Sequence, residues 1–335
     1  MPPARTRIAA LLVAALLALT PASLAGEPSP PVLARFVTEG GVPAAALLTT
    51  TPGAPDRYTT AGGPTVRRNE HFRAGSVTKT FVATVVLQLV AEGRLSLDEP
   101  VRARLGDPVP GHRLDDRVTV RTLLTHTSGL YDYVRVTTSP APTSPRAALR
   151  TALTHVPRPV GSFAYSNTNY VVLGMLVERV TGHPYAVEAE RRILTPLALT
   201  GTSFPGARRA LPTPHRPGEP DVDPRVAGAA GELVSTLDDL TRFYSALLGG
   251  RLLPAEQMRE LLDTSATGGR YGMAVFPERL SCGLTVWGHN GRITGSAVRA
   301  ATTADGRRTL VFRVTTDRQA DRGLQRALLE SAFCP

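Results

Sequence analysis

The chain of 335 residues carries a formal net charge of +10 and contains only two cysteines, Cys282 and Cys334. Its arginines are spread along the chain and are not clustered with aromatic residues between them, which argues against a nucleic-acid partner. Histidines and cysteines do not occur at metal-ligand spacing, so we expect neither a metal site nor a cofactor.

The first 25 residues have the pattern of a secretory signal peptide. Arginines near the start precede an apolar run from Ile8 to Leu19, and Ser23-Leu24-Ala25 offers small residues for cleavage. The run is shorter than the about 20 apolar residues that a membrane-spanning helix needs. We therefore expect a secreted, extracellular protein without a stable membrane anchor, in which residues 26–335 form one domain. In an exported chain the even pair Cys282 and Cys334 indicates one disulfide.

The periodicity of the chain changes twice, from strands to helices and back. Strand patterns occur at residues 42–50 and 57–61, and again at 284–291, 297–302 and 309–315. Helical patterns occur at 146–155, 170–180, 233–248 and 254–262, and a terminal helix is predicted at 322–333. We therefore expect an α+β fold in which both chain ends, about 30–90 and about 270–335, build one antiparallel sheet flanked by helices. An all-helical part, about 95–265, is inserted between them.

A serine and a lysine lie one helical turn apart in a buried helix predicted from about Ser76 to Ala91. Ser76 at the helix N-terminus lies beside unpaired backbone N–H groups and the positive end of the helix dipole. Lys79 is the only lysine among 38 basic residues. Arginine cannot release its proton in a protein, whereas the pKa of a buried lysine can be lowered into the working range. We therefore expect Ser76 to be a nucleophile with Lys79 as its base; the alternative is a helix cap beside an ion-paired lysine.

Three further segments carry polar residues that can face a cleft. Tyr165 and Asn167 lie on a loop that leads into a predicted helix, and His289 lies on a predicted strand. Each has an ordinary alternative, as a capping aromatic, a turn residue or a surface histidine. His126, in Thr-His-Thr-Ser-Gly, is a weaker catalytic candidate, because a buried histidine that ties down the turn is more common.

Taken in order, Ser76-x-x-Lys79, Tyr165-x-Asn167 and His289-x-Gly291 resemble the motifs of the serine penicillin-recognising enzymes. More narrowly, the chain is similar to the exported D-alanyl-D-alanine carboxypeptidase/transpeptidases of filamentous actinomycetes, which are relatives of class C β-lactamases. The likeness covers nearly the whole mature chain and extends to the segments around both cysteines, which match the region of the family's disulfide.

The resemblance implies a role for each motif. Ser76 would attack the carbonyl of a D-Ala-D-Ala peptide or a β-lactam and become acylated. Lys79 and Tyr165 would share the proton transfers, and which of them is the base stays open. Asn167 would orient the acyl amide of the substrate.

The third motif would line the cleft from its strand. His289 would donate a hydrogen bond or adjust the pKa of Tyr165, and the small Gly291 would let the substrate backbone approach. The backbone N–H groups of Ser76 and Arg292 would form the oxyanion hole.

Four positions depart from the pattern of the family. Asn290 stands where Thr or Ser is usual, and Arg292 stands where the close relatives have Thr. The position of an arginine that helps to hold the substrate carboxylate is taken by Glu278, and a pocket tryptophan is replaced by Arg225. We expect Arg292 to bind that carboxylate instead, the alternative being that it points to solvent.

The leading hypothesis is therefore a serine D-Ala-D-Ala carboxypeptidase, with transpeptidation also open, that acts on peptidoglycan-type stem peptides and binds β-lactams. The alternatives are a β-lactamase, an esterase, an amidase acting on D-amino-acid derivatives, or a non-catalytic penicillin-binding module. We expect the protein to be a monomer.

Overall fold

The computed structural model describes residues 31–63, 66–136, 144–206, 223, 226–316 and 320–334. The predicted signal peptide and Arg225 lie outside these residues. No helix among the described residues is long and apolar enough to cross a membrane.

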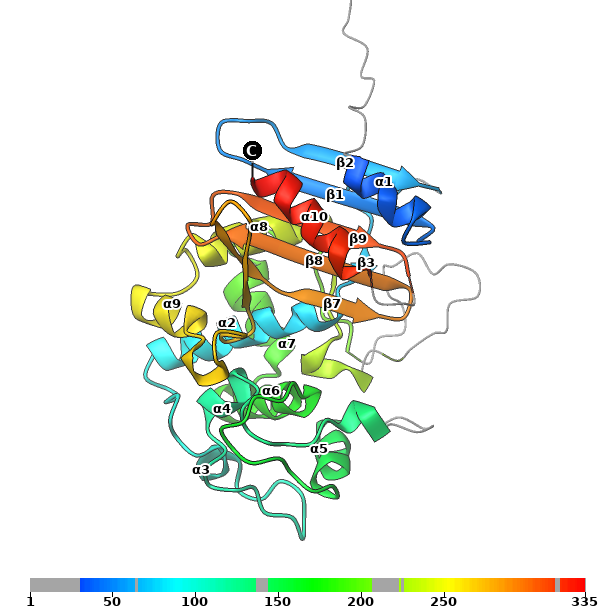
Figure 1. Cartoon of the computed structure of the whole chain (residues 1–335). Coiled ribbons are helices and arrows are strands. Elements are labelled where there is room, and N and C mark those ends of the chain that lie inside the picture. The colour runs from blue at the N-terminus through cyan, green and yellow to red at the C-terminus, as the bar shows by residue number, and fades with distance from the viewer. Residues whose placement is uncertain are drawn as a thin grey trace, which may run out of the picture.

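A seven-stranded antiparallel sheet joins the two ends of the chain (Figure 1). Its strands run in the order β2 (Arg57–Gly62), β1 (Ala44–Thr50), β9 (Thr309–Val314), β8 (Ser296–Thr303), β6 (Thr285–Gly288) and β5 (Phe276–Arg279), and β7 (Asn290–Ile293) also pairs with β8. The junction between the chain ends is the pairing of β1 with β9. This arrangement, with helices on both faces, confirms the predicted α+β fold.

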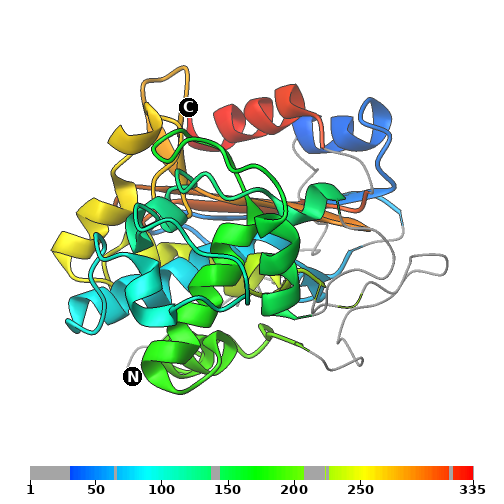
Figure 2. The ribbon, with the colours of Figure 1, turned by 90° about the horizontal axis from the view of Figure 1, so that it is seen from below.

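Side chains alternate across the sheet, so each strand contributes to two cores. From β1, Leu47 packs with α1 (Pro31–Thr38) and α10 (Arg322–Phe333), while Leu48 packs with the larger core on the other face. Figure 2 shows α1 and α10 together on one side of the sheet and the remaining helices on the other. The sequence predicted α10 but not α1, a helix of only eight residues that begins at a proline.

The inserted part of the chain is mostly helical but not all-helical as predicted, because it also contains the short strand β4 (Val234–Ser235). It contains α3 (Val101–Leu105), α4 (Val120–Leu124), α5 (Pro145–Leu153), α6 (Asn167–Thr181), α7 (Tyr185–Ala189), α8 (Leu237–Leu248) and α9 (Ala255–Leu262). The helix predicted at 233–248 starts later, because Thr236 caps α8 by accepting a hydrogen bond from Asp239 N. The preceding β4 (Val234–Ser235) pairs instead with β3 (Phe72–Arg73).

The helix α2 (Thr78–Ala91) runs through the centre of the larger core, and almost all of its side chains are buried. A short 3₁₀ turn, Gly75–Val77, precedes it, so Ser76 lies in this turn rather than in the helix itself. Thr78 fastens the turn: its hydroxyl donates to Gly75 O at 2.6 Å and accepts from Leu233 N at 3.0 Å. The start of α2 is therefore held by the segment that leads into β4.

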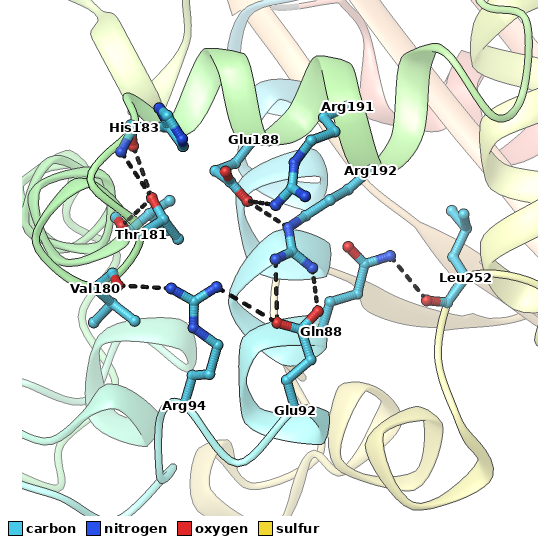
Figure 3. Close-up of polar contacts among 11 residues, drawn as sticks. Gln88, Glu92, Arg94, Val180, Thr181, His183, Glu188, Arg191, Arg192 and Leu252 are labelled. Carbon is cyan, nitrogen blue, oxygen red and sulfur yellow. Dashed lines mark hydrogen bonds and ion pairs between the residues drawn. The ribbon is translucent and has the colours of Figure 1, made fainter.

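The other end of α2 is fastened by an ion-pair network (Figure 3). Arg192 donates to Glu188 through Nε at 2.5 Å, and its two Nη atoms donate to Glu92 at the end of α2. Arg191 also donates to Glu188, at 2.8 Å. Burial of Glu188 opposes its ionisation, but the hydrogen bonds from Arg192 and Arg191 outweigh it and lower the pKa of the carboxyl. Glu188 is thus a buried charge that depends on its arginine partners.

We predict that Arg192→Met lowers the free energy of unfolding by about 3 kcal/mol, because a buried carboxylate loses its closest cation. Arg191→Met is the matched control: its side chain is 62% exposed, and its loss is expected to cost less than about 1 kcal/mol. Urea unfolding curves of the two variants and the unaltered protein give the comparison. The deficit of Arg192→Met should shrink as the pH falls, since protonation of Glu188 removes the unpaired charge. Equal losses in both variants would contradict the assignment.

Candidate active site

The three sequence motifs meet at one cavity of about 470 Å³. Ser76 reaches it from the turn before α2, Tyr165 and Asn167 from the start of α6, and Asn290 to Arg292 from β7. Tyr133, Val134 and the segment around Ala230 complete much of the remaining wall. The antiparallel sheet and the helical insertion therefore each supply part of this site.

Lys79 is wholly buried and contacts three oxygen atoms. Its Nζ lies 3.1 Å from Ser76 Oγ, 2.8 Å from Asn167 Oδ1 and 2.6 Å from Ala230 O. Burial lowers the pKa of Lys79 to about 7, although the charge of Asp132 acts in the opposite direction. Near neutral pH a substantial fraction of the amine is therefore unprotonated.

The two carbonyl oxygens determine how the neutral amine is oriented. Asn167 Oδ1 and Ala230 O can only accept hydrogen bonds, so they take the two N–H groups of an uncharged Lys79. The nitrogen lone pair then faces Ser76 Oγ and can accept the hydroxyl proton. This geometry is compatible with Lys79 acting as a base toward Ser76 as well as a source of positive charge.

Tyr165 lies beside the same serine. Burial raises the pKa of Tyr165 well above its ordinary value, and a hydrogen bond with Ser76 offsets this only in part. Lys79 Nζ is 5.1 Å from the centre of the tyrosine ring. Because Tyr165 stays protonated at neutral pH, the pKa values favour Lys79 as the base and leave Tyr165 as a donor.

Asn167 is held by a residue that the motif search did not single out. Asp132 accepts a hydrogen bond from the backbone N of Asn167 at 3.1 Å. Both of its carboxylate oxygens also lie 3.2 Å from Asn167 Nδ2, which donates to them. Asp132 was not predicted as a site residue, because no local sequence pattern marks it. The role of Ala230 could not be predicted for a different reason. It contacts Lys79 through its backbone carbonyl, which every residue type carries.

His289 is buried next to the site and does not line the cavity. Its Nδ1 donates to Asn290 O, so Nε2 accepts the hydrogen bond from the hydroxyl of Tyr271, at 2.9 Å. Burial and the charge of Lys79 lower the pKa of His289 to about 3, which keeps the ring neutral. Both ring nitrogens are occupied, so the structure links His289 to Tyr271 and not to a ligand.

The glycines of two motifs permit the strand β7 to approach the serine turn. A Cβ on Gly291 would lie 1.8 Å from Ala74 O, and one on Gly75, whose φ is +51°, would lie 2.8 Å from Arg292 N. Because both residues are glycines, the two backbone segments can lie this close, with Ser76 and Arg292 both lining the cavity. Side chains at either glycine would force them apart.

Arg292 and Glu278 differ in their surroundings. Arg292 lines the cavity and is exposed, and its guanidinium has no hydrogen-bond or ion-pair partner among the described residues. Glu278 does not line the cavity; it pairs with the buried Arg299 at 3.5 Å and with Arg326 at 3.9 Å. Arg292 is therefore a cation available at the site, whereas Glu278 belongs to a separate ion-pair cluster.

His126 packs against Tyr165. Its ring centre is 4.2 Å from that of Tyr165, and its Nδ1 accepts from Ser166 N at 3.3 Å and from Asn169 Nδ2 at 3.0 Å. The residue has φ of +59°, which is rare outside glycine. Burial lowers the pKa of His126 well below its ordinary value. These contacts favour the structural alternative, in which His126 supports the loop that carries Tyr165.

The two cysteines lie far from this chemistry. Cys282 and Cys334 are joined by a disulfide with 5.8 Å between their Cα atoms, and neither residue lines the cavity. The bond ties the turn between β5 and β6 to the end of α10.

Comparison with known proteins relates this site to a large group of hydrolases. The family model described as Beta-lactamase matches residues 31–331. Penicillin-binding protein 4 of Amycolatopsis lactamdurans is 30% identical, over 80% of this chain and 82% of that protein. PbpX of Bacillus subtilis is 27% identical, and the chain spans only 53% of its length.

Two solved structures are similar over nearly their whole length. A D-stereospecific amidohydrolase from Streptomyces sp. superimposes with a TM-score of 0.81 and 38% identity, covering 90% of this chain and 97% of that chain. A D-amino acid amidase from Ochrobactrum anthropi SV3 gives a TM-score of 0.78 and 25% identity, covering 90% and 98%.

We predict that the amine of Lys79 titrates near pH 7 in the folded protein and near the ordinary 10.5 in the unfolded chain. Lysine labelled with ¹³C at Cε gives one NMR signal, because Lys79 is the only lysine. Between those two pKa values the unfolded chain binds more protons, so this group makes the free energy of unfolding rise with pH across the window. A folded-state signal that titrates close to 10.5 would show an amine that is always charged at neutral pH.

Proposed function

The chain belongs to the β-lactamase family of serine hydrolases, and from this premise we propose that it cleaves amide bonds of D-amino-acid peptides or amides through an acyl-enzyme on Ser76. The observation that carries the proposal is the buried amine of Lys79, whose two N–H groups are taken by carbonyl oxygens and whose lone pair faces Ser76 Oγ.

In the acylation step Ser76 Oγ attacks the substrate carbonyl carbon and its proton passes to Lys79 Nζ. The negative oxygen that develops would be bound by the backbone N–H groups of Ser76 and Arg292. As the carbon–nitrogen bond breaks, the leaving nitrogen takes a proton from the Tyr165 hydroxyl, which recovers one from Lys79. Water then attacks the acyl ester, gives its proton to the same pair of residues, and releases the acid and free Ser76.

The choice of D-configured substrates rests on the relatives. The solved amidohydrolase that shares 38% of its residues with this chain is named as D-stereospecific, and it is matched over 97% of its length. The similar structure from Ochrobactrum anthropi is named as a D-amino acid amidase. The predicted signal peptide supports action outside the cell.

A D-Ala-D-Ala carboxypeptidase is the second candidate, and Arg292 favours it. An exposed guanidinium without a partner at the cavity suits the free carboxylate of a peptide C-terminus. The similarity to penicillin-binding protein 4 supports binding of β-lactams at the same serine.

We predict that Ser76→Ala loses both amide turnover and covalent labelling, since no acyl-enzyme forms without the hydroxyl. Ammonia release from D-phenylalanine amide measures turnover, with L-phenylalanine amide as the stereochemical control. Intact mass after incubation with benzylpenicillin measures labelling. Stoichiometric labelling of Ser76→Ala would identify a different nucleophile. Equal turnover of the two enantiomers by the unaltered protein would contradict the D-preference.

Arg292→Ala separates the two candidate substrates. We predict that the transition-state stabilisation measured by kcat/KM for an acyl-D-Ala-D-Ala peptide falls by about 2 kcal/mol, the contribution of one hydrogen bond to a charged group. The kcat/KM for D-phenylalanine amide should change little. Arg307→Ala, at an exposed arginine in the turn between β8 and β9, is the control for a change of net charge. Equal losses on both substrates would indicate distortion of the oxyanion hole, and no loss on either would exclude Arg292 as the carboxylate anchor.

A further inference from the structure

Asp132 is linked to the catalytic lysine through one side chain, and the reaction steps above give it no part. Its carboxylate accepts from the backbone N and from Nδ2 of Asn167, at 3.1 and 3.2 Å. Asn167 Oδ1 in turn accepts from Lys79 Nζ at 2.8 Å. Asp132, Asn167 and Lys79 thus form a continuous hydrogen-bonded row that ends at the amine.

This row permits only one orientation of the Asn167 amide. With Nδ2 toward Asp132 and Oδ1 toward Lys79, every donor meets an acceptor. Turning the amide by 180° would set its oxygen against the carboxylate and its N–H groups against those of Lys79. In the turned state Lys79 would lose one of the two acceptors that direct its lone pair toward Ser76.

Among the described residues, no basic side chain forms an ion pair with the carboxylate of Asp132, although the protein has 38 basic residues. The other titratable groups packed around the amine come from different elements and are Tyr165, Tyr170, His126 and His289. Burial raises the pKa of both tyrosines and lowers the pKa of both histidines, so all four are neutral near pH 7. Asp132 is the charged group that acts on Lys79.

We propose that Asp132 is a positioning residue for the catalytic lysine: it holds the Asn167 amide with its oxygen toward Lys79, and its charge strengthens Lys79 as the base for Ser76. The proposal rests on the proposed function for its catalytic consequence. Its structural part concerns only the amine and can be measured without substrate.

Two substitutions separate orientation from charge. Asp132→Asn keeps the shape and one acceptor oxygen for Asn167 but removes the charge, whereas Asp132→Ala removes both. Asp116→Asn is the matched control, because Asp116 is exposed and pairs with Arg102 and Arg113 away from the cavity. Circular dichroism and melting curves confirm that each variant is folded before it is compared.

The first readout is the NMR titration of lysine labelled with ¹³C at Cε. In Asp132→Asn the pKa of Lys79 should fall below that of the unaltered protein, since burial is then unopposed. Asp116→Asn should leave it unchanged. An unchanged pKa of Lys79 in Asp132→Asn overturns the role of the charge, whether or not the protein is active.

The second readout is the rate at which benzylpenicillin acylates Ser76, followed by intact mass. We expect a loss of about tenfold in Asp132→Asn and about a hundredfold in Asp132→Ala, the range of a misplaced proton-transfer group. Equal rates in both variants and in Asp116→Asn overturn the positioning role. If the unaltered protein is not acylated at all, the proposed function fails, while the titration of Lys79 still decides the contribution of Asp132.

Discussion

Burying the amine of Lys79 imposes conditions on three separate parts of the chain. A lysine inside a protein core is costly when charged, so burial favours the neutral form and lowers its pKa to about 7. The neutral amine still needs partners for its two N–H groups. One comes from Asn167 at the start of α6 and the other from the carbonyl of Ala230. The environment of Lys79 therefore forms only after α2, α6 and the segment before β4 have packed together, so the proposed base depends on the integrity of the helical core.

The sheet contributes by bringing β7 against the serine turn. Here the fit depends on the absence of side chains, because Gly291 and Gly75 each occupy a place where a Cβ would collide with the opposite backbone. The register of β8 against β9, and of β9 against β1, fixes where β7 lies. Ser76, the proposed nucleophile, thus lies between the buried helix α2 and the strand β7.

The sequence predicted the parts of this architecture that have local patterns. The helix α10 was predicted with its observed bounds, since its apolar residues recur at helical spacing and Asp321 caps it. Ser76, Lys79 and Tyr165 were found because their residue types and order are informative. Ala230 acts through its backbone, and Asp132 acts through another residue, so neither has a signature in one sequence. The environment of His289 also could not be predicted, because only the packed structure shows that Tyr271 occupies its second nitrogen.

The two electrostatic elements of the site differ in how strongly solvent weakens them. The interactions of Lys79 are buried, so salt should affect the chemistry of acylation little. Arg292 is exposed, so salt screens its interaction with a carboxylate more strongly than it screens the buried contacts of Lys79. The carboxylate-binding arginine that the family resemblance implies is replaced by Glu278, which itself pairs with Arg299 and Arg326. Under the proposed function, recognition of a carboxylate would therefore depend on one screened arginine, while acylation of Ser76 would not need its side chain. The proposed site would then accept amides that lack a carboxylate as well as peptides with a free C-terminus.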